Sequence, residues 1–159
     1  MNSRRKGHNW ERDLATRLRE IFGAERVRRG RQAEGACEPD VVVEDVPWWF
    51  ECKCGGPAEF PAKALVQAED DSARRIRPSW PVAICKMDRK PPTASLRLDT
   101  LFRVVQMSGV SLGRALVTLP LGDFLRVVEA VELRQSEARG KKHAAEWPTV
   151  PKNDVCAGA

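Results

Sequence analysis

The sequence predicts a single α/β domain in which helices flank a mixed central sheet. The chain has 159 residues, a length that suits one domain with one core. Its first part shows helical apolar spacing, and farther along short runs of β-branched and aromatic residues alternate with helical segments. We therefore expect one domain over residues 1–139. Residues 140–159, rich in small, polar and proline residues, are expected to form a flexible tail.

The first element is predicted to be an amphipathic helix over residues 8–22. Trp10, Leu14 and Leu18 recur at helical spacing, and Gly23 provides a stop. On a helical wheel of about 100° per residue, Glu11 falls within this apolar stripe. A carboxylate in that position costs desolvation energy unless a cation lies near it. Glu11 is therefore a candidate functional residue.

The next elements are predicted to be short strands, at residues 25–29, 39–44 and 48–54, with a loop at 29–36. If Asp45 and Val46 form the turn between the last two strands, Asp40 lies opposite Glu51. Lys53 then projects from the same face, while Phe50 and Cys52 point into the core.

Two carboxylates and an ammonium on one face are costly unless they serve each other or a cation, and Mg²⁺ favours carboxylates and water as ligands. The alternative interpretation is a salt-bridged strand pair without a catalytic role.

The rest of the chain continues the alternation of helices and strands. The expected order is a helix over 61–77, strands at 81–87 and 94–98, a helix over 100–107 capped by Asp99, a strand near 115–119 and a helix over 123–139.

The basic charge is concentrated at the start of the chain. Residues 1–31 hold ten Lys/Arg and four Asp/Glu, whereas the whole chain holds 27 and 22. A polyanionic partner would explain this asymmetry, and a solvated basic face is the alternative. No stretch approaches the roughly 18 apolar residues of a membrane helix, and the start does not resemble a secretory signal. We therefore expect a cytoplasmic protein, not bound to a membrane, whose five cysteines are free thiols.

The strand residues carry a resemblance to a known family. Pro39-Asp40 followed by Glu51-Cys52-Lys53 resembles the PD-(D/E)xK motif of restriction-endonuclease-like nucleases. Arg5-Lys6-Gly7, with Glu11 on the first helix, is similar to the archaeal-type Holliday junction resolvases and their phage relatives. The resemblance covers about residues 4–90 and implies the restriction-endonuclease-like sheet. It also implies Mg²⁺, with Mn²⁺ as a substitute, bound by Glu11, Asp40, Glu51 and the backbone carbonyl of Cys52.

Further roles follow from the same resemblance. Lys53 would be the catalytic lysine, and Gln67 would support the site from the next helix. Phosphates would be held by Arg4, Arg5, Lys6, Arg29 and Arg31. The implied activity is resolution of four-way DNA junctions by a homodimer that needs no organic cofactor. It would serve recombination and repair in a prokaryotic or phage-infected cell.

Two features depart from the resolvase pattern. Resolvases of this type usually carry a serine in the loop before the aspartate, and residues 30–35 contain none. The chain also continues well past the catalytic core of about residues 4–90 that the resemblance implies, with an additional segment over 96–139. Two alternatives therefore stay open: a nuclease of the same fold for other branched, flap or mismatched DNA, and a non-catalytic basic DNA-binding module.

Overall fold

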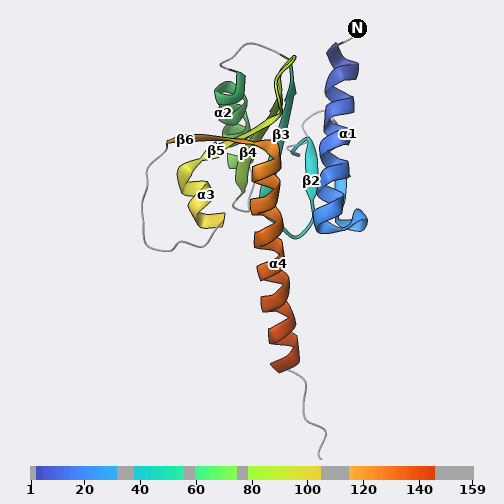
Figure 1. Ribbon diagram of the computed structural model, residues 1–159, viewed down its shortest axis with the longest axis vertical. Coiled ribbons are helices and arrows are strands. Elements are labelled where there is room, and N and C mark those ends of the chain that lie inside the picture. The colour runs from blue at the N-terminus through green and yellow to red at the C-terminus, as the bar shows by residue number, and fades with distance from the viewer. Residues whose placement is uncertain (1–2, 32–37, 56–59, 75–78, 105–114, 146–159) are drawn as a thin grey trace, which may run out of the picture.

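The fold is built on a six-stranded mixed sheet (Figure 1). The computed structural model describes residues 3–31, 38–55, 60–74, 79–104 and 115–145. The strands lie in the sheet in sequence order: β1 (Val27–Arg29), β2 (Val41–Val43), β3 (Trp48–Cys54), β4 (Trp80–Lys86), β5 (Thr93–Arg97) and β6 (Leu116–Pro120). Strands β3 and β4 are parallel, and all other neighbours are antiparallel. The predicted α/β class with a mixed sheet is confirmed.

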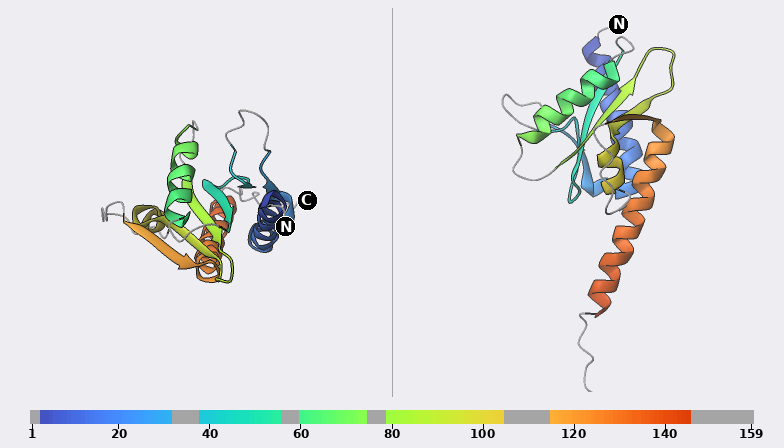
Figure 2. Two further views of the ribbon diagram at one scale, coloured as in Figure 1. Left: turned by 90° about the horizontal axis from the view of Figure 1, so that it is seen from above. Right: turned by 90° about the vertical axis from the view of Figure 1, so that its left-hand side faces the viewer.

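Helices cover both faces of this sheet, as the view from above shows (Figure 2). Helices α1 (Ser3–Phe22) and α4 (Leu121–Ala145) pack on one face, while α2 (Phe60–Ala73) crosses the other face between β3 and β4. A short 3₁₀ turn, η1 (Ala24–Arg26), follows α1, and α3 (Leu98–Val104) follows β5. None of the helices in the described ranges combines the length and the apolar character that a membrane crossing requires.

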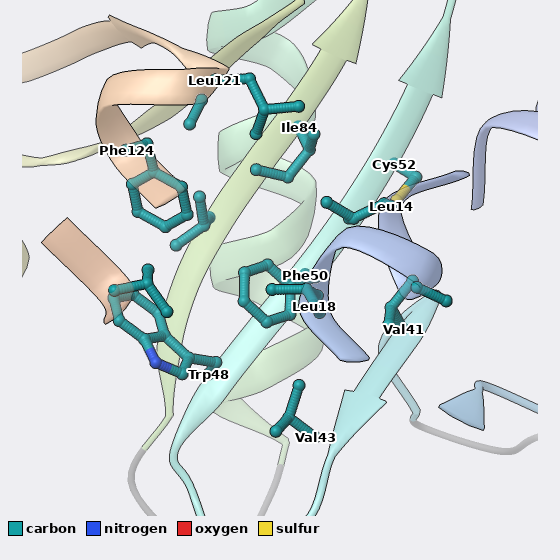
Figure 3. Close-up of a cluster of buried hydrophobic side chains, with 14 of the residues drawn as sticks. Leu14, Leu18, Val41, Val43, Trp48, Phe50, Cys52, Ile84, Leu121 and Phe124 are labelled. Atoms are coloured by element: carbon teal, nitrogen blue, oxygen red, sulfur yellow. The ribbon is translucent and has the colours of Figure 1, made fainter. Parts of the chain in front are cut away.

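The main core lies between the sheet and the two helices α1 and α4 (Figure 3). Leu14 and Leu18 of α1 are fully buried, as the predicted apolar stripe requires. Trp48 of β3 lies in the middle: its ring stacks on Phe50 at 5.8 Å between centroids and meets the edge of Phe124 from α4 at 5.6 Å. The core therefore locks α1 and α4 onto β3, the strand that carries Glu51 and Lys53.

A smaller apolar cluster lies on the opposite face, under α2. It joins Ala64 and Leu65 of α2 to Ala83 and Cys85 of β4. Cys85 is a free thiol, and burial raises its pKa to about 11. Cys52 and Cys54 are also free thiols, as we expected. These contacts hold α2 against the face from which Glu51 and Lys53 project.

The β2–β3 hairpin has the predicted register. Val41 pairs with Phe50, as this register requires. Asp40 lies just before β2 and its N–H donates to the Phe50 carbonyl, so Asp40 and Glu51 do not form the ladder pair that the sequence predicts. The turn contains Asp45 with φ of 62°, a left-handed conformation that aspartate tolerates better than most residues. Phe50 and Cys52 enter the main core, also as predicted.

Several helix boundaries differ from the prediction. Helix α1 begins at Ser3, five residues earlier than expected. Asp99 lies inside the first turn of α3 and accepts a hydrogen bond from the Thr100 N–H at 2.7 Å, so it does not precede that helix as a cap. Helix α4 continues past Gly140 to Ala145, because good helix formers on both sides offset the cost of about 1 kcal/mol for one glycine. Residues 140–145, which we expected in the tail, therefore belong to α4, and residues 146–159 lie outside the described part.

Candidate functional site

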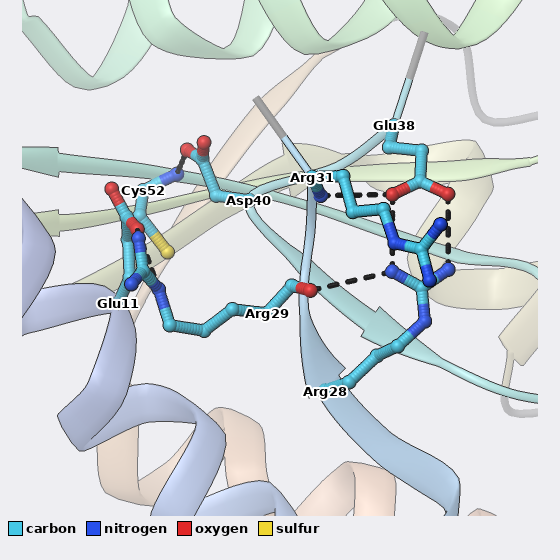
Figure 4. A network of polar contacts seen from close by, with 7 residues as sticks. All are labelled: Glu11, Arg28, Arg29, Arg31, Glu38, Asp40 and Cys52. Carbon is cyan, nitrogen blue, oxygen red and sulfur yellow. Dashed lines mark hydrogen bonds and ion pairs between the residues drawn. The ribbon is translucent and has the colours of Figure 1, made fainter. Parts of the chain in front are cut away.

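Asp40 is held by bonds to the strands on both sides of it (Figure 4). Its backbone N–H donates to the Phe50 carbonyl at 3.0 Å, and its own carbonyl accepts from the Gly30 N–H at 2.9 Å. Its side-chain Oδ2 accepts from the Cys52 N–H at 2.7 Å. Gly30 is required for this approach, because a Cβ there would lie 1.9 Å from the Pro39 carbonyl oxygen. The position of the Asp40 carboxylate is thus fixed by backbone.

Glu51 and Lys53 project from one face of β3, two residues apart. The Lys53 Nζ lies 2.6 Å from Glu51 Oε1, and the two side chains are 26% and 8% exposed. The pair therefore combines a short charge-assisted hydrogen bond with low solvent access. Solvent reaches the pair mainly through Lys53, the more exposed of the two side chains.

Glu11 is buried in the apolar stripe of α1, as the helical wheel predicts. Its Oε2 accepts a hydrogen bond from Arg29 Nε at 2.9 Å, and Arg29 Nη2 contacts the same oxygen. The cation that a buried Glu11 requires is therefore supplied by β1. Arg29, which we expected to hold a phosphate, is engaged with a carboxylate in this state.

The three carboxylates form one electrostatic group with Asp40 in the middle. Burial raises the pKa of Asp40, and the negative charge of Glu11 raises it further, against the hydrogen bond from Cys52 N–H. Burial also raises the pKa of Glu51, and the charge of Asp40 adds to that effect. Burial is the largest cause of both pKa shifts, and the positive charges of Lys53 and Arg29 offset it only in part.

Lys53 keeps its proton in this setting. Burial lowers the pKa of its ammonium, but the hydrogen bond to Glu51 and the neighbouring carboxylates outweigh that effect, so the pKa lies above its usual value. The side chain therefore acts as a cation and proton donor here, and a neutral amine base is disfavoured.

The site suits a hard divalent cation in its chemistry but is not arranged around one. Glu11, Asp40 and Glu51 supply the oxygen ligands that Mg²⁺ prefers. Each carboxylate is turned to its own partner, and among the described residues no three His, Cys, Asp or Glu side chains converge closely enough to hold an ion. Binding a cation would require Glu11 to leave Arg29 and Glu51 to leave Lys53.

Gln67, the expected supporting residue, is exposed on α2. Asp71, one helical turn later, has the clearer link to the site, because its negative charge helps to raise the Glu51 pKa. Asp71 also lies 3.5 Å from Arg74 in an ion pair. Sequence reasoning missed Asp71. The available signal was its spacing of four residues from Gln67, which places both residues on the same face of the helix.

A second polar network lies beside the first and closes the base of the segment 32–37, which is outside the described residues (Figure 4). Arg28 donates to both carboxylate oxygens of Glu38, at 3.0 and 2.9 Å, and the Arg31 N–H donates to Glu38 Oε2 at 2.9 Å. The Arg28 hydrogen bonds lower the pKa of Glu38 to about 2. Nothing in the sequence pointed to this pair, because its two residues flank a loop without periodicity.

The remaining predicted phosphate ligands lie near the start of α1 and just after β1. Arg5 and Lys6 are on the first turns of α1, and Arg31 is exposed just after β1. Arg4 lies on α1 as well, but its side chain is outside the described part. The structure thus brings Glu11, Asp40, Glu51 and Lys53 together and leaves Gln67 and Arg31 at the surface.

Comparison with known proteins gives one distant likeness. No family model matches the sequence, and no curated protein matches it. Among solved structures, the chain is similar to Hjc, a Holliday junction resolvase from the archaeal hyperthermophile Archaeoglobus fulgidus. The identity is 15%, the match covers 75% of this chain and 99% of that chain, and the TM-score is 0.40. At this level the chemistry of the site has to be interpreted from its own residues.

Proposed function

We propose that this protein is a metal-dependent endonuclease that cuts branched DNA, with the four-way junction as its substrate. The observation that carries the proposal is the group formed by the buried Glu11 and Glu51 with the partly buried Asp40, and the Lys53 ammonium 2.6 Å from Glu51. Buried carboxylates with raised pKa values are costly to the fold, so a catalytic use explains why this chain carries them. A salt-bridged strand pair would explain Glu51 and Lys53 but leaves Asp40 without a counter-ion of its own.

Glu11, Asp40 and Glu51, with the backbone carbonyl of Cys52, would hold Mg²⁺ or Mn²⁺. When bound, such an ion supplies positive charge that polarises a phosphate and acidifies water. The carboxylates of this chain would then lose their mutual repulsion. Arg29, displaced from Glu11, would become available to a phosphate oxygen.

Lys53 would act directly on the reacting phosphate. Its ammonium can donate hydrogen bonds to a non-bridging oxygen, where negative charge grows during attack at phosphorus. Its elevated pKa suits a group that stays charged throughout this step. Without a cation, Glu51 holds the ammonium at 2.6 Å, and binding of a cation to Glu51 would release the ammonium toward the phosphate.

A homodimer would match the substrate. A four-way junction has two-fold symmetry, so two copies of one site can cut two strands symmetrically. The excess of basic residues at the start of the chain would provide the affinity for phosphates that a nuclease needs. The corresponding cellular process is DNA recombination and repair.

The test is cleavage of a synthetic four-way junction beside linear duplex and flap substrates, with Mg²⁺ and with EDTA. The Glu51→Gln protein serves as the inactive comparison. Paired symmetric nicks in the junction, lost with EDTA and in the variant, are expected. Equal cutting of every substrate would mean a general nuclease on the same site. Tight DNA binding with no cutting would overturn the enzyme and leave a DNA-binding module.

A further inference from the structure

The turn between β4 and β5 has an unusual backbone for its sequence. The Lys90 N–H donates to the Met87 carbonyl at 3.2 Å and closes a four-residue turn. Within it Arg89 has φ of 58°, in the left-handed region that glycine and asparagine adopt most readily. An arginine therefore occupies a position where glycine would be less strained.

This turn lies against the start of α1, about 80 residues earlier in the sequence. The Lys6 Nζ is 3.8 Å from Asp88 Oδ1, and the Lys86 ammonium lies 5.1 Å from the centre of the Trp10 ring. Both views of the ribbon place the β4–β5 turn near the same end of the molecule as the start of α1 (Figures 1 and 2). Two distant segments thus meet in space.

The same end of the molecule holds the exit of β3. Lys53 pairs in register with Cys85, the residue before Lys86, and the Gly55 N–H donates to the Lys86 carbonyl at 2.8 Å. The turn therefore begins at Met87, two residues beyond the strand position beside Lys53. A ligand lying along this end of the sheet would reach both.

The combined surface is basic, and we name it the turn surface: Arg5, Lys6, Lys86, Arg89 and Lys90. Arg5, Lys86, Arg89 and Lys90 are exposed. Asp88, whose side chain is 77% exposed, is the acidic residue between Lys86 and Arg89. Lys86 is held in place by Trp10, whose indole is buried and donates to the Ile84 carbonyl at 3.3 Å.

No contact among the described residues accounts for the strained position of Arg89. Among the described residues its side chain makes no ion pair or hydrogen bond, and the turn would be less strained with glycine. Strain that the fold does not repay is a common mark of a functional position. The guanidinium is therefore available to a partner outside the chain.

We propose that the turn surface binds the phosphate backbone of DNA beside the catalytic site, with Arg89 as its central contact and Asp88 as a restraint on affinity. This proposal rests on the proposed nuclease function. It adds the β4–β5 turn to the basic residues at the start of the chain as a DNA-binding segment. Arginine binds phosphate in a bidentate manner, and several cations along one edge suit a run of backbone phosphates.

The test measures DNA binding by fluorescence anisotropy over a range of salt concentrations, with EDTA present so that no cleavage occurs. Arg89→Gly should weaken binding several-fold and reduce the dependence of log Kd on log salt by about 1. Its melting temperature should stay the same or rise, because glycine relieves the strained φ. Asp88→Asn should bind more tightly, since it removes a negative charge and an exposed ion pair of little structural value.

A matched pair of triple variants separates position from total charge. Changing Lys86, Arg89 and Lys90 to Gln should reduce the salt dependence by about 3. Changing Arg74, Arg126 and Arg134 to Gln removes the same charge from exposed positions at the end of α2 and along α4 and should leave binding nearly unchanged.

Equal weakening of binding by both triple variants would overturn the inference. Unchanged binding in Arg89→Gly together with no tightening in Asp88→Asn would overturn it as well. If the unaltered protein binds DNA and cuts it while the turn variants behave like the unaltered protein, the proposed function stands and the turn surface fails. If the unaltered protein binds no DNA, both fail.

Discussion

The backbone N–H of Cys52 donates a hydrogen bond to the Asp40 carboxylate at 2.7 Å, so a side chain from the end of one strand is held by the backbone of the next. This bond places a partly buried negative charge close enough to Glu11 and Glu51 to interact with both. Burial and the charge of Glu11 nevertheless raise the pKa of Asp40, so the hydrogen bond offsets only part of the cost. The fold tolerates a carboxylate there at the expense of stability.

Asp40→Asn should therefore stabilise the protein in EDTA while abolishing cleavage. The amide oxygen can still accept the Cys52 N–H, and the repulsion by Glu11 and Glu51 disappears. We expect the melting temperature to rise by about 2–4 °C, equivalent to about 1 kcal/mol in a chain of this size. Thermal unfolding with and without Mg²⁺, beside a junction-cleavage assay, checks both effects.

The control for this variant is Asp13→Asn, on the outer face of α1. Its ion pair with Arg17 is exposed, so little change in melting temperature is expected. A lower melting temperature in Asp40→Asn would mean that the Asp40 charge stabilises the fold, which contradicts the direction of its pKa shift.

Arg29→Gln should destabilise the protein and make its stability depend more strongly on divalent cations. The change leaves the buried Glu11 carboxylate without its partner, at a cost of about 2–3 kcal/mol. Mg²⁺ or Ca²⁺ should then restore part of the loss, because a cation that binds only the folded state adds stability by mass action. Chemical denaturation with and without each ion measures the effect.

Arg17→Gln is the matched control, since its partner Asp13 is exposed and the pair spans 3.4 Å. It should cost less than about 1 kcal/mol and show the same cation response as the unaltered protein. If Arg29→Gln responds to cations no more than Arg17→Gln does, Glu11 is not a ligand.

The Arg28–Glu38 pair should make stability sensitive to acid. The pKa of Glu38 is about 2 in the folded protein, below its usual value of 4.5. A lowered carboxyl pKa contributes stability that is complete above pH 4.5 and is lost as the pH falls toward 2. Glu38→Gln should thus cost about 1–2 kcal/mol at neutral pH, a figure discounted for the 42% exposure of Arg28, and flatten the loss of stability between pH 4.5 and 2.

Glu20→Gln, an exposed change on α1, provides the baseline for the same pH series. It should leave the slope below pH 4.5 as steep as in the unaltered protein. An equal slope in Glu38→Gln would show that the pair with Arg28 does not form in solution.

Short-range chemistry made much of the fold predictable. The alternation of Phe50 and Cys52 with Glu51 and Lys53 fixes which face of β3 enters the core, and the turn at Asp45 sets the register in which Val41 pairs with Phe50. The position of Glu11 in the α1 stripe followed from helical spacing alone.

Contacts between distant segments could not be predicted in the same way. Arg29 could have pointed to solvent or to Glu11, and local pattern does not distinguish the two. The Lys6–Asp88 contact depends on how α1 crosses the sheet, and the Arg28–Glu38 pair depends on the path of a loop. The extent of α4 was underestimated because one glycine is a weak helix stop when its neighbours favour helix.

The most direct test of the central claim is single-turnover cleavage of a four-way junction by the unaltered protein and by Lys53→Met, at saturating protein and with Mg²⁺. Methionine keeps the unbranched shape of the side chain and removes the ammonium that contacts Glu51 at 2.6 Å. We predict equal junction binding and a cleavage rate at least about 100-fold lower in the variant. Cleavage by Lys53→Met at the rate of the unaltered protein would contradict the assignment of this site.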